Sequence, residues 1–113
     1  MNKNYSIESL EVIADGDKDF MKIVAKTFLE EIPPDLASMV EAINNNNKKL
    51  TYQFAHKMKP NLEMFGINVL KDITTIESWT KTLKSTIAIR ANIEYISTIL
   101  EKVFEELKED FSF

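Results

Sequence analysis

The segment Ala55–Gly66, AHKMKPNLEMFG, contains the only histidine of the chain, His56. A free imidazole has a pKa of about 6.5, so near neutral pH a large uncharged fraction has a nitrogen lone pair available for nucleophilic attack. Lys57 and Lys59 flank His56 and can neutralise phosphate oxygens. Because phosphoryl transfer depends mainly on positioning and charge neutralisation, these residue types favour phosphoryl chemistry at His56.

The spacing of apolar residues predicts the direction in which His56 points. At about 100° per residue, a helix over residues 48–65 places its apolar side chains on one side and His56 on the opposite side. We therefore expect the imidazole to be exposed to solvent. The predicted core-facing residues are Leu50, Phe54, Ala55, Met58, Leu62 and Phe65, and the outward-facing residues include Lys49, Tyr52, Gln53, Lys59, Pro60 and Glu63.

Two features around His56 favour a functional role over that of an ordinary solvated histidine. From Lys48 to Lys59 the chain has four lysines and no acidic residue, although its net charge is −4, which predicts a local positive patch. Pro60 costs about 3 kcal/mol inside a helix and removes the hydrogen bond to the carbonyl of His56. Pro60 either serves a site at His56 or only kinks a long helix.

The segment resembles the signature of histidine phosphotransfer (HPt) domains. In that signature a His is followed by any residue, an apolar residue, Lys, a small residue and, ten positions after the His, Gly. The corresponding residues here are His56, Met58, Lys59, Pro60 and Gly66. The family commonly has Gly where this chain has Pro60, which affects how a partner docks.

The resemblance extends from about Asp17 to Leu107, because FMKIVAKTFLEEIPPDLASMVEAI is similar to the family's long helix with its mid-helix proline. It implies that His56 is phosphorylated on the ring nitrogen far from the backbone. The donor would be an aspartyl phosphate on a receiver domain, and the acceptor the aspartate of another receiver. It also implies receiver domains of response regulators or a hybrid sensor histidine kinase as partners, with Mg²⁺ held by the receiver and no cofactor on this chain.

Several residues near His56 are candidates for supporting roles, with Lys59 and Lys57 stabilising phosphate charge. Lys49 and Gln53 either line a docking surface or are only solvated. Glu63 either orients the imidazole or pairs with Lys59 on a wet face. Pro60 and Gly66 are the remaining docking candidates. A further apolar set either supplies exposed contacts beside His56 or caps the core: Ile7, Leu10, Ile13 and Met21.

Composition and local signals predict one all-α domain spanning residues 1–113. Two glycines and three prolines are too few for a turn-rich β architecture. Ser6, Asp17, Asn47 and Asn68 are predicted N-caps. The predicted helices span residues 7–14, 18–44, 48–65, 69–83 and 87–109, the second of them running through Pro33 and Pro34. The simplest fold is an up-down antiparallel four-helix bundle with a short additional N-terminal helix.

Apolar stripes indicate which faces of these helices are buried. The predicted stripes are Phe20, Ile23, Val24, Thr27, Phe28, Leu36, Met39, Val40 and Ile43 in the second helix, Val69, Ile73, Ile76, Trp79 and Leu83 in the fourth, and Ile89, Ile93, Ile96, Leu100, Val103 and Leu107 in the fifth.

The sequence also argues against several function classes. It has no cysteine, only one histidine, no glycine-rich phosphate loop and no Ser/His/Asp set, so we expect no metal site and no autonomous kinase or hydrolase activity. No run approaches the roughly 20 apolar residues of a membrane span, and the acidic balance disfavours nucleic acid. We expect a cytoplasmic monomer. The alternative function is a non-phosphorylated helical adaptor bundle that binds a receiver or a partner helix.

Overall fold

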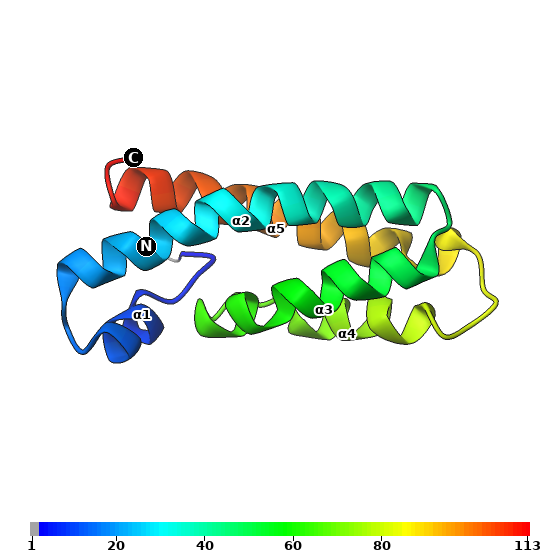
Figure 1. Ribbon diagram of the computed structural model, residues 1–113, viewed down its shortest axis with the longest axis horizontal. Coiled ribbons are helices and arrows are strands. Elements are labelled where there is room, and N and C mark those ends of the chain that lie inside the picture. The colour runs from blue at the N-terminus through cyan, green and yellow to red at the C-terminus, as the bar shows by residue number, and fades with distance from the viewer. Residues whose placement is uncertain (1–2) are drawn as a thin grey trace.

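The computed structural model describes residues 3–113, and this part of the chain is all-helical without strands, as predicted. In Figure 1, α2 and α5 lie in one layer and α3 and α4 in the other. α2 packs against α3 and α5, α4 packs against the same two helices, and α1 packs against α2. None of the helices within residues 3–113 combines the length and apolar character needed to cross a membrane. The elements are α1 (Ile7–Ala14), α2 (Lys18–Asn44), α3 (Lys48–Met64), α4 (Leu70–Trp79), a 3-10 turn η1 (Thr86–Ile89) and α5 (Arg90–Asp110).

Three of the four predicted N-caps are confirmed. The side chains of Ser6, Asp17 and Asn47 each accept a hydrogen bond from a backbone N–H in the first turn of the following helix. Each bond satisfies a donor that has no partner within its own helix. The predicted cap at Asn68 is wrong, because α4 begins after Val69 without a side-chain cap.

The buried stripe of the first half of α2 differs from the prediction. Phe20 and Ile23 are 44% and 60% exposed and Met21 and Ala25 are buried instead, whereas Phe28 is buried as predicted. The core-facing side is turned because α1 packs against α2, and Phe28 packs on Phe65 with ring centroids 4.2 Å apart and planes tilted by 32°. The residues Leu36, Met39 and Ile43 of the second half, and Ile96, Leu100, Val103 and Leu107 of α5, are buried as predicted.

The prediction that the fourth helix reaches residue 83 is wrong, because α4 ends at Trp79 and Leu83 is fully exposed. Trp79 Nε1 donates to the carbonyl of Lys84 at 3.1 Å, and Lys48 Nζ donates to the same carbonyl at 3.0 Å. These bonds hold the chain in a turn after Trp79. The prediction that Leu50 faces the core is also wrong, because Leu50 is 40% exposed.

The short helix α1 closes one end of the core. Leu10 and Met21 are almost fully buried, so both cap the core and neither offers an exposed contact. Ile7 is partly buried against the core, while Ile13 is 46% exposed. Of the apolar residues proposed to contact a partner beside His56, only Ile13 is thus largely accessible.

Residues 3–6, here called the N-terminal strap, connect the ends of α3 and α5. The backbone N–H of Ser6 donates to the carbonyl of Phe65 at 2.8 Å. The Tyr5 hydroxyl donates to Asp110 Oδ2 at 2.6 Å. Because these contacts join residues far apart in sequence, the strap fixes the end of α3 opposite to the α2–α3 turn.

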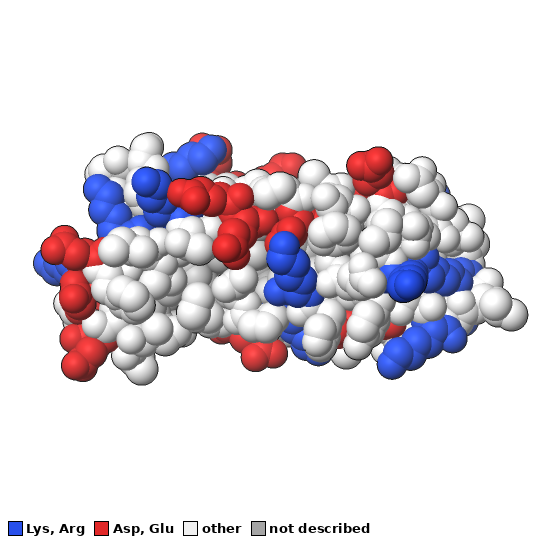
Figure 2. Space-filling model, in the orientation of Figure 1, with Lys and Arg blue, Asp and Glu red and all other residues white. Residues whose placement is uncertain are grey.

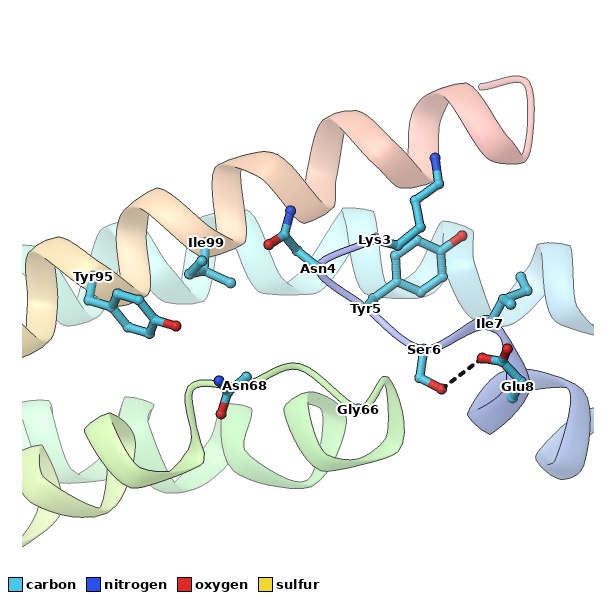
Figure 3. Close-up of a pocket in the computed structure, with 10 residues that line it drawn as sticks. All are labelled: Lys3, Asn4, Tyr5, Ser6, Ile7, Glu8, Gly66, Asn68, Tyr95 and Ile99. Atoms are coloured by element: carbon cyan, nitrogen blue, oxygen red, sulfur yellow. Dashed lines mark hydrogen bonds between the residues drawn. The ribbon is translucent and has the colours of Figure 1, made fainter. Parts of the chain in front are cut away.

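Figure 3 shows a hollow between the strap, Gly66, Asn68 and the α5 residues Tyr95 and Ile99. Gly66 follows His56 by ten residues, which corresponds to about 15 Å along a helix axis. His56 is not among the residues that line the hollow. The hollow is therefore separate from the imidazole and plays no part in the candidate site described below.

We predict that Gly66→Ala is much more destabilising than Gly16→Ala. Both glycines have positive φ, +61° and +78°, so alanine is strained by about 1–2 kcal/mol at either position. A Cβ on Gly66 would lie 2.7 Å from Ser6 Cβ in the strap, whereas one on Gly16 meets nothing within 4 Å. The clash should add about 1–3 kcal/mol for Gly66. Urea denaturation of the two variants measures this difference, and equal losses would contradict the close approach of the strap.

The Tyr5 to Asp110 hydrogen bond predicts a specific dependence of stability on pH. Burial and then this bond raise the pKa of Tyr5 above its usual 10.0, and the bond lowers the pKa of Asp110 from its usual 3.8. The contribution of Tyr5 to the free energy of unfolding is present below about pH 10 and is lost as the pH rises. The contribution of Asp110 is present above about pH 4 and is lost as the pH falls. The stability difference between the parent and Tyr5→Phe should be constant from about pH 5 to 9 and shrink on both sides. Urea denaturation across pH measures it, and a difference unchanged above pH 10 would contradict the bond.

Candidate functional site

His56 lies on the solvent side of α3. Its side chain is 67% exposed, while the neighbouring Ala55 and Met58 are fully buried. This is the direction that the helical spacing predicts, because residues one and two positions from His56 turn toward the core. A partner molecule can therefore reach the imidazole without any rearrangement of the core.

A carboxylate from the next helix contacts the His56 ring. Nδ1 of His56 lies 3.2 Å from Oε2 of Glu77, which belongs to α4 and whose side chain is only 12% exposed. A carboxylate can only accept a hydrogen bond, so Nδ1 is the nitrogen that carries the proton. In the uncharged ring Nε2 then has no proton and keeps its lone pair, as a nucleophile requires.

Lys59 shares the same carboxylate. Its Nζ donates to Glu77 Oε1 at 3.0 Å, so the two oxygens of Glu77 hold one cation and one imidazole. The hydrogen bond to Glu77, the largest cause, raises the pKa of Lys59 above its usual 10.5. The ammonium group consequently keeps its charge near neutral pH and lies next to the group that holds the ring.

Lys57 is held by a different helix. Its Nζ donates to Oδ1 of Asp35 at 3.0 Å, and Asp35 is a buried residue of α2. At about 100° per residue, Lys57 and Lys59 leave α3 on opposite sides of His56. The two lysines thus flank the imidazole, and each is tied by a carboxylate to a neighbouring helix.

An aromatic ring covers one face of the imidazole. Tyr52 precedes His56 by one helical turn, and the two rings are stacked with centroids 5.5 Å apart and planes 9° apart. Lys81 Nζ lies 5.8 Å from the centroid of the Tyr52 ring. Such offset stacking is a favourable arrangement of aromatic rings. His56 is therefore contacted on a face by Tyr52 and at an edge by Glu77.

A shallow basic surface adjoins this cluster. On the face shown in Figure 2, basic side chains gather at the end of the molecule formed by the α2–α3 turn and the α4–α5 connection. The predicted docking residues Lys49 and Gln53 belong to a shallow hollow at this end. Its lining residues are Lys48, Lys49, Tyr52, Gln53, Thr80 and Lys81.

The other predicted supporting residues lie further along α3. Pro60 and Glu63 are exposed, and Gly66 follows the end of the helix. Glu77 contacts the imidazole and pairs with Lys59, and the charge of Glu63 contributes less to the raised pKa of Lys59 than Glu77 does. Glu63 is seven residues from His56, so its side chain starts about two turns away along the helix.

Three residues of the cluster were not predicted as functional: Tyr52, Glu77 and Asp35. The sequence contained a clue to Glu77 and Asp35, because each is an acidic residue directly next to a core residue. These core residues are Ile76 and Leu36. Acidic residues are rarely buried without a partner. The sequence also contained a clue to Tyr52, because it lies four positions before His56 and residues at this spacing on a helix are neighbours.

These contacts define what the site can do chemically. The imidazole is accessible, its protonated nitrogen is held by Glu77, and its other nitrogen has a free lone pair. Ammonium groups on both sides can offset the charge of an anionic group attached to the ring. Among residues 3–113, no group of three or more Asp, Glu or His side chains is placed to hold a metal ion. The cluster is thus equipped to accept an electrophilic group, such as a phosphoryl group, on Nε2.

Comparisons of the chain with protein-family models, with curated proteins and with solved structures find no match.

Proposed function

We propose that the chain is a histidine phosphotransfer domain, in which His56 carries a phosphoryl group between aspartates of receiver domains in two-component signal transduction. The observation that carries the proposal is the hydrogen bond from Nδ1 of the exposed His56 ring to Glu77, at 3.2 Å. It leaves Nε2 as an accessible nucleophile. The resemblance of Ala55–Gly66 to the HPt signature supports the same function.

The proposed transfer of the phosphoryl group to His56 needs no proton donor and no proton acceptor. The Nε2 lone pair of His56 attacks the phosphorus of an aspartyl phosphate, forming an N–P bond as the bond from phosphorus to the carboxylate oxygen breaks. The aspartate leaves as a carboxylate, and its charge is met by the Mg²⁺ that we expect in the receiver. The reverse step passes the phosphoryl group to the aspartate of a second receiver.

Charges in the cluster suit the phosphorylated ring. With phosphorus on Nε2 and a proton on Nδ1, the imidazole ring is cationic, and the carboxylate of Glu77 already contacts Nδ1. Lys59 offsets the charge of Glu77 and lies one helical turn from His56. We propose that Lys59, with Lys57 on the other side, stabilises the phosphate charge.

The helices that hold His56 have a proposed arrangement of their own. We propose that α2, α3, α4 and α5 form an up-down antiparallel four-helix bundle with α1 as an addition, which is supported by the closed cycle of packing among these four helices. Such a bundle closes its own core, so we propose a monomer. The proposed setting is cytoplasmic, and the proposed domain has no kinase or hydrolase activity of its own.

Incubation with a phosphorylated receiver domain and Mg²⁺ tests the proposal. The chain should acquire a phosphate that is lost in acid and retained in base, as expected of a phosphorus–nitrogen bond, and the label should map to a peptide containing His56. ATP alone should not label it. A chain that stays unlabelled, or that acquires acid-stable phosphate, would contradict the proposed function.

A further inference from the structure

Tyr52 makes a contact that the transfer step does not by itself require. Its ring is half-buried and lies parallel to the His56 ring, with centroids 5.5 Å apart and an angle of 9°. Lys81 approaches Tyr52 from the chain after α4, with Nζ 5.8 Å from the ring centroid. Tyr52 is therefore contacted by His56 of its own helix and by Lys81 of the turn that follows α4.

The contacts of Tyr52 and Glu77 restrain the imidazole in complementary ways. The torsion that turns a histidine ring has a broad preference, so a ring that is 67% exposed can adopt several orientations when nothing contacts it. The hydrogen bond to Glu77 fixes the position of Nδ1, and stacking on Tyr52 fixes the plane of the ring. Together the two contacts determine the direction in which Nε2 points.

We propose that Tyr52 is a positioning residue for phosphoryl transfer, which holds the plane of the His56 ring so that Nε2 faces the incoming phosphoryl group. The inference rests on the proposed function of His56. Orientation of reacting atoms lowers a barrier because the entropy cost is met before reaction. The face of Tyr52 also carries negative electrostatic potential, which favours the cationic ring present after Nε2 is phosphorylated.

The proposal requires the aromatic face of Tyr52 but not its hydroxyl. Tyr52→Phe should therefore keep the labelling rate of the parent, whereas Tyr52→Ala should lower it. Tyr95→Ala is a matched control, because Tyr95 is a partly exposed tyrosine of α5 that lines the separate hollow in Figure 3. All three variants change an exposed or half-buried aromatic side chain on a helix.

Two measurements on these variants test the inference. In the first, NMR records the chemical shifts of the His56 ring protons, which move when the ring current of Tyr52 is removed. We expect this shift in Tyr52→Ala and not in Tyr52→Phe or Tyr95→Ala. In the second, the initial rate of labelling by a phosphorylated receiver should fall about two- to tenfold in Tyr52→Ala, the range expected for one aromatic stack. The rate should stay within about twofold of the parent in the other two variants.

The possible outcomes separate this inference from the proposed function. If the parent is labelled and Tyr52→Ala is labelled at the same rate, the positioning role is overturned while the function of His56 stands. An equal loss of rate in Tyr52→Phe also overturns it, because the hydroxyl would then be the essential group. If the parent itself takes up no phosphate, the proposed function fails and the role of Tyr52 fails with it.

Discussion

His56→Gln should take up no phosphate from a phosphorylated receiver, a loss of the entire signal relative to the parent. The lone pair of the glutamine amide nitrogen is delocalised, so the variant lacks the nucleophile while it keeps a polar side chain that can bond to Glu77. The His56 side chain is 67% exposed, and its replacement should lower the free energy of unfolding by no more than about 1.5 kcal/mol, the range of the one aromatic stack that is lost. Labelling and urea denaturation of the same preparation measure both expectations.

The same experiment distinguishes the phosphotransfer function from the adaptor alternative. An adaptor would bind the receiver whether or not residue 56 is a histidine, and neither the parent nor His56→Gln would acquire phosphate. Binding to the receiver is measured separately for both proteins. Labelling of His56→Gln at the rate of the parent would instead place the phosphate on another residue and contradict the role of His56.

Glu77→Gln should lower the initial rate of labelling by about tenfold or more. The carboxylate of Glu77 accepts from both His56 Nδ1 and Lys59 Nζ, whereas an amide has only one oxygen for these two donors. If Lys59 takes that oxygen, the amide nitrogen faces Nδ1 and favours the ring form with the proton on Nε2. That form has no lone pair at Nε2, and a preference of about 1.4 kcal/mol for it lowers the rate about tenfold.

Glu63→Gln is the matched control for Glu77→Gln. Glu63 is an exposed acidic residue of α3, and the carboxylate that contacts the imidazole belongs to Glu77 instead. The control should keep the labelling rate within about twofold of the parent. The labelling rates of both variants are compared across pH. Equal rates for the parent and Glu77→Gln would contradict the assignment of the proton to Nδ1.

Features that depend on nearby residues could be predicted from the sequence. The caps at Ser6, Asp17 and Asn47 follow from side chains that bond within one turn of the chain. The outward direction of His56 follows from the period of the apolar residues of its own helix. Both depend only on the geometry of a single helix, which short-range spacing determines.

Features that depend on contacts between helices were missed. The spacing of Leu83 continues the stripe of α4, but hydrogen bonds from Trp79 and Lys48 to the carbonyl of Lys84 stop the helix earlier. Glu77 is 21 residues from His56, and only the packing of α4 against α3 brings them together. A spacing rule within one helix cannot provide the register between two helices, so it offered only Glu63 of the same helix, either to orient the imidazole or to pair with Lys59.

The most direct test of the central claim is to identify the nitrogen of His56 that carries phosphorus. NMR of the phosphorylated protein, with the histidine labelled with ¹⁵N, reports the coupling between phosphorus and each ring nitrogen. The coupling should appear at Nε2, while Nδ1 retains its proton and its bond to Glu77. Phosphorus on Nδ1, or on a residue other than His56, would contradict the account.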